Sequence, residues 1–203
     1  MARIYAITST TTVATVSGTV AAAASALVAA GLYQFVSSTA CWIRQGTSKT
    51  ITCVAKANLV DGETIKITYN GTTVTYEFDV NGTGVTAGNI QVNVSADTTA
   101  ATVAARLKTA IDANQGTVLT TTNPGAGVLT VDRPDSIDLT ITEQVADAGF
   151  TIGTGVMQAT AGAGSQYLPA NVVVMLKGAQ GGQLGVIQDA AGGKSSTTRL
   201  MVE

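Results

Sequence analysis

The sequence contains no histidine, and it has few residues of the other types on which catalysis usually depends. Its 203 residues include two cysteines, and only 12% are charged and 4% aromatic. Without histidine, neither the Ser-His and Cys-His nucleophile arrangements nor the usual proton shuttle near neutral pH can form. Two thiols alone also cannot complete a tetrahedral zinc site built from nitrogen and sulfur ligands. We therefore predict that the chain is not an enzyme and has no catalytic residues, cofactor or metal.

Strong charge of either sign is also missing. Eleven basic and 13 acidic residues give a net charge of −2 and a pI near 5.0, and the basic residues form no run. Binding to a phosphate backbone by counterion release needs clustered cations, so we predict no direct contact with nucleic acid. The apolar segment 20–31 falls short of the roughly 20 residues that cross a bilayer, and threonines interrupt the residues before it. No membrane association and no signal peptide are predicted.

The two cysteines, Cys41 and Cys53, are expected to be buried free thiols, because an unpaired cysteine behaves as a small apolar core residue. A disulfide between them stays open as an alternative. The sequence alone cannot place their Cα atoms within bonding distance.

The residues that are abundant, Thr, Ala, Val and Gly, favour short strands and tight turns. The two ends of the chain look like halves of one small β-domain, and neither half is long enough to bury a core alone. We predict a discontinuous outer β-sandwich over 1–47 and 164–203, with a separate domain inserted at 48–163. Its expected strands are 33–36, 41–44, 172–176, 184–188 and 198–202, with Trp42 and Tyr33 in its centre.

The inserted segment carries the clearest local signals. Alternating apolar residues over 63–69 and 72–80 flank Asn70-Gly71, which is typical of a hairpin with a type I′ turn. A further strand is expected at 90–94. After the helix described next, strands are expected at 117–122, 128–131 and 137–141, separated by turns at 123–125 and 133–135.

One helix is predicted, from about 98 to 113, because four apolar residues recur there at helical spacing. These residues are Val103, Leu107, Ala110 and Ile111. Ser95 or Asp97 is the expected N-cap, and Asn114 with Gly116 the expected end. The fold class is therefore mainly β: a discontinuous β-sandwich with an inserted antiparallel sheet and one α-helix.

Three aspartates at a spacing of three residues, Asp132, Asp135 and Asp138, form the one acidic group to weigh, beside the pair Asp61 and Glu63. Carboxylates can bind Ca²⁺ or supply the acid and base of a glycosidase. Asp132 and Asp135 flank Pro134 in a predicted turn, however, and Asp138 lies on the exposed face of a predicted strand, so we favour solvated charges over either site.

Several short motifs resemble small β-sandwich virion proteins of tailed bacteriophages. They are Ala-Gly-Leu-Tyr at 30–33, Thr-Ala-Cys-Trp-Ile at 39–43, Gly-Ser-Gln-Tyr-Leu-Pro-Ala at 164–170 and Leu-Gly-Val-Ile-Gln at 184–188. Residues 61–64, 76–79 and 87–89 and the alanine-rich helix are similar to a β-rich module that recurs in phage head and tail proteins. The resemblance implies a virion component without catalysis, and it supplies no active-site residues.

On this basis we expect a capsid decoration or cement protein on the head exterior, made in the bacterial host cytoplasm. Its expected partner is the major capsid protein, and it is expected to form a homo-oligomer, for which a trimer is one candidate state. The alternatives are a tail, neck or collar component, or a module that binds host-surface carbohydrate through the insert.

The expected assembly interface lies in the uncharged N-terminal region, at Tyr5, Ile7, Val13, Val16, Leu27 and Val28. An extended arm rich in Thr and Val can add a strand to a neighbour's sheet. The alternative is that this region forms a pair of strands inside its own domain.

Overall fold

The computed structural model describes residues 4–6, 12–15, 25–26, 31–134, 138–157, 165–178, 183–188 and 194–202. Over these residues the fold is mainly β with a single α-helix, which confirms the predicted class. The chain folds as two compact units. Unit 1 comprises 1–47, 134–137 and 156–203, and unit 2 comprises 48–133 and 138–155.

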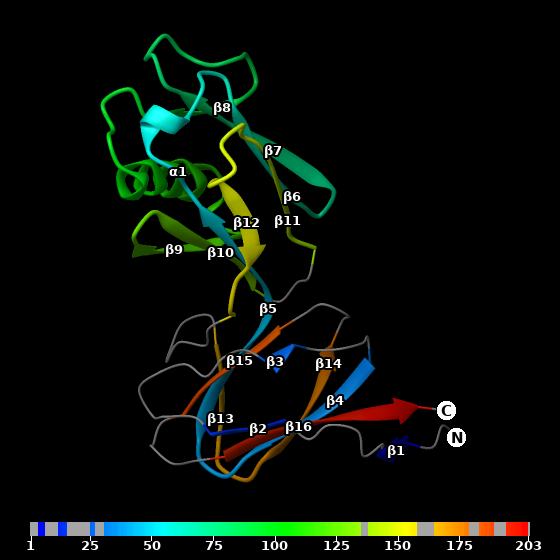
Figure 1. The fold of residues 1–203 in the computed structure, drawn as a ribbon. Helices are drawn as coiled ribbons and strands as arrows, with labels where there is room; N and C mark the ends of the chain where they lie inside the picture. The colour runs from blue at the N-terminus through cyan, green and yellow to red at the C-terminus, as the bar shows by residue number, and fades with distance from the viewer. Residues whose placement is uncertain are drawn as a thin grey trace. The chain divides into compact units, whose positions relative to one another are not determined.

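Unit 1 contains two antiparallel sheets. The first has the order β1-β16-β4-β14, and β2 also pairs with β16. Its strands are β1 (Ile4–Ala6), β2 (Thr12–Thr15), β4 (Gly31–Ser37), β14 (Val173–Gly178) and β16 (Lys194–Val202). Because β1 lies antiparallel to the end of β16, the first and last strands of the chain are neighbours (Figure 1).

The second sheet of unit 1 is built on the first half of β5 (Cys41–Thr52), which pairs with β13 (Gln166–Leu168) and β15 (Gln183–Gln188). The short strand β3 (Ser25–Ala26) pairs with β15. One apolar cluster joins the two sheets: Phe35 comes from the first, and Cys41, Ile43, Leu168 and Leu184 from the second. Two antiparallel sheets that share such a core form a β-sandwich.

The prediction that Trp42 packs in the centre of this sandwich is wrong. Cys41 and Ile43 are buried, and successive side chains of a strand point to opposite faces, so Trp42 lies on the outer face of the sheet. It is partly exposed there and packs against Tyr167, its direct neighbour across the strand pair. Tyr33 lies in β4, and its side chain is outside the described part of the structure.

Unit 2 begins with the predicted hairpin, which is confirmed. β6 (Thr64–Tyr69) and β7 (Thr72–Asp79) pair with Tyr69 opposite Thr72. Asn70 and Gly71 have φ values of 48° and 71°, the positive values of a type I′ turn. With β8 (Ile90–Asn93) and β11 (Thr140–Gln144), the hairpin forms a four-stranded sheet in the order β11-β6-β7-β8.

The pairing of β8 departs from the predicted antiparallel sheet, because β8 runs parallel to β7. Tyr76 is opposite Ile90 and Asp79 is opposite Asn93, so β8 lies beside only the last four residues of β7. The connection over 80–89 therefore has to run back past only four residues of β7, not past the whole strand. Ten residues span that distance easily.

Helix α1 (Ala100–Gln115) confirms the predicted helix, displaced by two residues. Its N-cap is Thr99, and neither Ser95 nor Asp97 has this role. The Thr99 side chain accepts a hydrogen bond from the backbone N–H of Thr102, whose hydroxyl accepts in turn from the N–H of Thr99, a capping box. The helix buries Val103, Ala104, Leu107, Ile111 and Gln115, whereas Ala110 is partly exposed.

Of the strands after α1, only β11 extends the first sheet of unit 2; β9, β10 and β12 join the sheet of β5, whereas a single sheet was predicted. β9 (Thr120–Gly125) and β10 (Val128–Pro134) form a hairpin, and β10 pairs with β5, whose second half also pairs with β12 (Thr151–Thr154). The turn of this hairpin is Ala126-Gly127, not the predicted 123–125, and Pro134 ends a strand. A short 3₁₀ helix follows β5 at Lys56–Asn58.

One apolar core spans both sheets and the helix of unit 2. Its fully buried members include Ile51, Ile67, Phe78, Leu107 and Leu129, and α1 contacts both β8 and β9 (Figure 1). Cys53 belongs to this core and Cys41 to that of unit 1, and both are buried free thiols, as predicted. Burial raises the pKa of the Cys53 thiol to about 12, which leaves it unreactive at neutral pH.

Candidate functional site

Two of the six predicted interface residues lie in described strands. Tyr5 is in β1 opposite Met201, and Val13 is in β2 opposite Ser196. Ile7, Val16, Leu27 and Val28 lie outside the described residues. Because β1 and β2 both pair with β16 of the same chain, these two strands have the arrangement of the internal-pair alternative. A role of the six residues in assembly stays a prediction.

Most of the exposed large apolar side chains in the described part of the chain belong to unit 1. Among the described residues, five large apolar side chains are exposed, and four of them lie between 156 and 173: Val156, Tyr167, Val172 and Val173. Tyr167 is 46% exposed and packs against Trp42, with ring centroids 5.0 Å apart and the ring planes tilted by 60°. Exposed aromatic and aliphatic groups of this kind are enriched where proteins bind other proteins.

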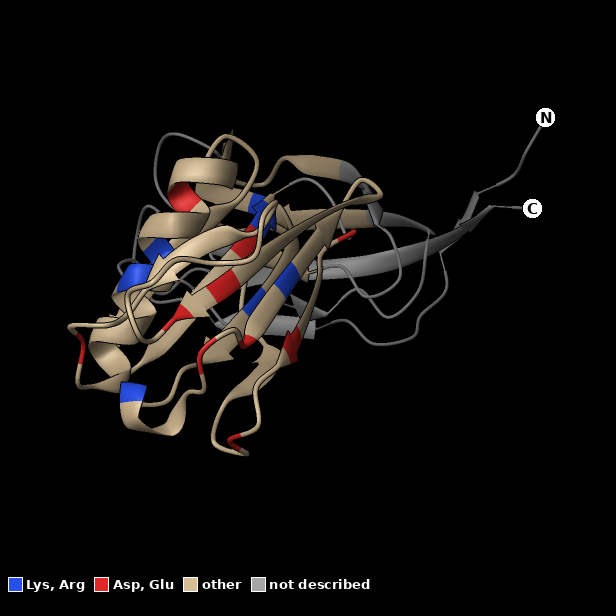
Figure 2. Ribbon diagram, turned by 90° about the horizontal axis from the view of Figure 1, so that it is seen from above, with Lys and Arg blue, Asp and Glu red and all other residues tan. Residues whose placement is uncertain are grey.

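Charged residues show the reverse distribution, since most of them belong to unit 2. The sequence of unit 1 contains eight charged residues: Arg3, Arg44, Asp135, Lys177, Asp189, Lys194, Arg199 and Glu203. The sixteen others all belong to unit 2. Figure 2 shows basic and acidic residues interspersed along the described ribbon. Unit 2 therefore has more charged groups that need hydration. Burying unit 1 against a partner costs less free energy, because fewer charges lose their water.

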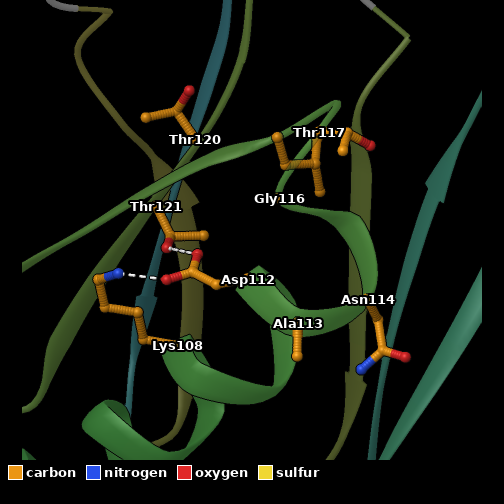
Figure 3. A pocket seen from close by; sticks show the side chains of 9 residues that line it. Lys108, Asp112, Ala113, Asn114, Gly116, Thr117, Thr120 and Thr121 are labelled. Atoms are coloured by element: carbon orange, nitrogen blue, oxygen red, sulfur yellow. Dashed lines mark hydrogen bonds and ion pairs between the residues drawn. The ribbon is translucent and has the colours of Figure 1, made fainter.

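A shallow polar pocket of about 400 Å³ lies at the carboxyl end of α1. Figure 3 shows the Asp112 side chain between Lys108, on the preceding turn, and Thr121, on β9. The Asp112 carboxylate forms an ion pair with Lys108 and accepts a hydrogen bond from the Thr121 hydroxyl. Asn114, Thr117 and Thr120 complete the polar lining.

This pocket is built to hold the helix end against β9. The Thr121 hydroxyl donates a hydrogen bond to a carboxylate that also forms an ion pair with Lys108, so Asp112 joins the helix to β9. The Asn114 amide donates to the carbonyl of Ala110, one turn earlier in the helix, at 2.8 Å. The polar groups that line the pocket therefore bind one another.

A second polar cluster fixes the loop between β7 and β8. The fully buried Asp79 carboxylate accepts hydrogen bonds from the backbone N–H groups of Gly82 at 2.7 Å and Gly84 at 3.2 Å, and from the Gln91 amide at 2.6 Å. Glu77 accepts from the Asn89 amide at 2.6 Å and from the backbone of Thr86.

The neighbouring Asp61 extends this cluster. Its carboxylate accepts from the backbone N–H of Val80 at 2.8 Å and from the Asn81 amide at 2.8 Å. The carboxylates of the cluster are thus occupied by protein donors, and no group of three potential metal ligands occurs within the described ranges.

These contacts lower the pKa of two carboxyl groups. Hydrogen bonding to Asn89 lowers the pKa of Glu77 most strongly. Burial would raise the pKa of Asp79, but the hydrogen bonds from Gln91, Gly82 and Gly84 outweigh it and the net shift is downward. Both groups therefore stay ionised well below neutral pH.

Sequence reasoning missed this cluster. The alternation over 76–79 assigns Glu77 and Asp79 to a solvated face of β7, yet both are buried because the loop covers that face. The available signal was the run of Asn, Gly and Thr after Asp79, which is typical of a loop that supplies backbone N–H groups to a carboxylate.

The aspartates considered as a calcium or glycosidase site do not form one among the described residues. Asp132 is buried at 6% exposure, contrary to the prediction of a solvated charge, because β10 enters the core of unit 2. Asp138 forms an ion pair with Arg133 at 3.2 Å and accepts from the backbone N–H of Asn70 at 2.6 Å. Asp135 lies outside the described residues. Asp138 thus links the β6–β7 turn to Arg133, whose guanidinium also lies 5.3 Å from the ring centre of Tyr69.

Within the described part of the chain, every helix is too short or too polar to traverse a lipid bilayer.

Comparisons with known proteins found only weak structural similarity. No family model matches the sequence, and no curated protein matches it. Among solved structures, the D1-D2-D3 domains of the flagellar cap protein FliD from Escherichia coli match 99% of this chain with 14% identity and a TM-score of 0.33. The D2-D3 domains of the same protein match with 14% identity and a TM-score of 0.31, covering 99% of both chains. The chain spans 57% of the length of the first of these structures. Similarity this low carries no conclusion about fold or function.

Proposed function

We propose that the chain is a structural protein of a tailed-phage particle that decorates the capsid exterior and bridges neighbouring capsid subunits. The sequence resemblance motivates this role. The division of the surface supports it: unit 1 combines exposed apolar side chains with few charges, and unit 2 carries most of the charge. In this proposal unit 1 attaches to the particle, and unit 2 remains in contact with water.

The mechanism is adhesion without chemistry. A folded domain that bridges two subunits removes surface from water on both, and stable contacts of this kind bury on the order of 1,200 to 2,000 Å². A protein that binds only the assembled lattice also shifts the equilibrium toward assembly by mass action. Each occupied site then opposes the outward pressure of the packaged genome.

Trp42 and Tyr167 are the side chains of unit 1 best suited to anchor such a contact. Aromatic groups dominate the energy of protein interfaces, and this pair is held rigidly by two hydrogen-bonded strands. The carbohydrate-binding alternative has less support, because the insert's Tyr76, Phe78 and Phe150 are core residues and offer no exposed platform.

Attachment through unit 1 can be tested by sedimenting phage heads with added purified protein. We expect Tyr167→Asp to reduce the bound fraction at least tenfold, since a charge on an apolar contact loses burial and is desolvated. Val60→Asp is the matched control, because Val60 is a 60% exposed valine in unit 2. If Tyr167→Asp binds as the wild type does while Val60→Asp does not, the proposed orientation is wrong.

A tail, neck or collar position would give the same surface properties. Copy number separates these positions from the head, since a capsid lattice needs hundreds of copies and the portal-tail axis a dozen or fewer.

A further inference from the structure

The loop between β7 and β8, residues 80–89, is tied to the rest of unit 2 through carboxylates. The hydrogen bonds that its donors give to residues outside the loop all end on three of them: Asp61, Glu77 and Asp79. The donors are the backbone N–H groups of Val80, Asn81, Gly82, Gly84 and Thr86 and the side-chain amides of Asn81 and Asn89. The position of the loop therefore depends on acceptors of one chemical kind.

The loop buries little apolar surface of its own. Residues 81–84 and 86–88 are exposed, and Val85 is partly exposed. The strands on either side differ, because Phe78 of β7 and Val92 of β8 are buried in the core of unit 2. Moving the loop away from the sheet therefore exposes few apolar groups, whereas separating the strands exposes the core.

Ion pairs do not hold the three carboxylates. Within the described ranges, each ion pair joins a basic residue to a different aspartate: Asp97, Asp112 or Asp138. The negative charges of Glu77 and Asp79 are stabilised by N–H groups of the loop and of β8 instead.

Charged groups on the neighbouring elements have other contacts. Glu63, which precedes β6, accepts hydrogen bonds from two backbone N–H groups. Lys56 of the 3₁₀ helix donates to a backbone carbonyl, and Arg106 of α1 pairs with Asp97. Lys66 lies on the same face of β6 as the residue opposite Glu77, but the described residues show no ion pair between them.

We propose that residues 80–89 form an acid-released flap, which opens when Glu77 and Asp79 take up protons while the sheets and α1 of unit 2 stay folded. One oxygen of Asp79 accepts from Gly82, and the other accepts from Gly84 and Gln91. A proton bound to either oxygen therefore brings an O–H group beside N–H donors. A neutral carboxyl group is also a weaker acceptor than a carboxylate.

The same geometry occurs at Glu77. The backbone N–H of Thr86 lies 3.1 and 3.2 Å from its two oxygens, and the Asn89 amide lies 2.6 Å from one of them. Protonation of Glu77 therefore weakens the contacts at the far end of the loop, and protonation of Asp79 weakens those at its start.

The direction of the pH dependence follows from these contacts. The pKa values of Glu77 and Asp79 lie below their ordinary values of 4.5 and 3.8, because hydrogen bonds stabilise the ionised forms. The flap is therefore closed at neutral pH. It opens as the pH falls through the folded-state pKa values.

Hydrogen exchange of the full chain, resolved to single amides by NMR, tests this proposal. Protection is expressed relative to an unstructured peptide at the same pH, which removes the intrinsic pH dependence of exchange. We expect the amides of Gly82, Gly84 and Thr86 to lose protection at least about tenfold between about pH 6 and pH 3. Amides of β6 and α1 should lose much less, since their partners are backbone carbonyls.

Two variants separate the charge of Glu77 from a general effect of lost acidic residues. Glu77→Gln mimics the protonated state, so the Thr86 amide should lose protection already at neutral pH and change little on acidification. Glu143→Gln is the matched control, because Glu143 lies on β11 and accepts from the backbone N–H of Val145, outside the loop. This variant should behave as the wild type does.

Loss of protection in the loop at a higher pH than in β6 and α1 supports the flap. Parallel loss in all three, which means global acid unfolding, overturns it. So does loop protection that persists to pH 3, or a Glu77→Gln variant that is protected as strongly as the wild type. If Glu77→Gln fails to fold, the pH series of the wild type decides alone. The result is independent of capsid attachment, since the flap lies wholly in unit 2.

Discussion

At Asp79 a single carboxylate fixes the start of a loop. One of its oxygens accepts from Gly82, and the other accepts from Gly84 and Gln91. Asp79→Asn replaces one of these oxygens with an N–H₂ group that faces donors, so the variant should unfold at a lower temperature than the wild type. Asp61→Asn is the control, because Asp61 is exposed and water can replace its contacts. The test is thermal unfolding followed by circular dichroism. Equal melting temperatures of the two variants would contradict this account.

Acid stability depends on the same cluster. The pKa values of Glu77 and Asp79 are lower in the folded chain than their ordinary values of 4.5 and 3.8. The stability that these carboxylates contribute is therefore fully present above about pH 5 and is lost as the pH falls through their folded-state pKa values. Urea midpoints should be constant between about pH 8 and 5 and should decline below about pH 4.5. Asp79→Asn should make that decline shallower, and an equally steep decline in the variant would count against the cluster.

Two glycines of the β9–β10 turn provide a matched pair of substitutions. Gly125 and Gly127 both have positive φ, at 97° and 80°. A Cβ at Gly125 would meet no atom within 4 Å, whereas a Cβ at Gly127 would lie 2.6 Å from the Cβ of Ala100. Gly125→Ala should therefore cost about 1 to 2 kcal/mol of stability through backbone strain alone, and Gly127→Ala at least about 1 kcal/mol more. Equal losses in chemical denaturation would contradict the close approach of α1 to this turn.

At the scale of elements, the start of α1 depends on an N-cap, Thr99, that the sequence pattern did not identify. Thr99→Ala removes the side-chain half of the capping box and should destabilise the protein by about 1 kcal/mol. Thr98→Ala is the control, since Thr98 is an exposed neighbour outside the helix. Denaturant unfolding of both variants gives the comparison. A loss at Thr98 as large as that at Thr99 would show that the helix begins elsewhere.

The elements that sequence predicts well are those whose pattern is local. The Asn70-Gly71 hairpin and the apolar face of α1 are fixed by residues a few positions apart, and both are confirmed. Pairings between distant segments are different, because no local pattern says that β8 lies parallel to β7 or that β9 and β10 join β5. Trp42 was misplaced for a similar reason: a large aromatic residue suggests a core, but alternation gives the inner positions to Cys41 and Ile43.

The polar sites were harder to predict than the strands. Glu77 and Asp79 alternate with Tyr76 and Phe78, which is typical of a strand with one wet face. Their burial depends on a loop that folds back over that face, and only the three-dimensional structure shows it. The predicted interface residues Tyr5 and Val13 were identified from composition, which does not show that β16 is their partner.

For the molecule as a whole, the contrast between its units carries the functional proposal. Unit 1 has four of the five exposed large apolar side chains among the described residues and few charges, and unit 2 has most of the charges. A chain of this kind suits a particle surface, where one part is covered by a partner and the other stays in water.

The most direct measurement is the copy number of this chain in purified particles of the tailed phage that we propose encodes it, determined by quantitative mass spectrometry. A capsid decoration protein should be present at hundreds of copies per particle, in a fixed ratio to the major capsid protein. A dozen copies or fewer would place the chain on the portal-tail axis, and its absence from mature particles would contradict a structural role in the virion.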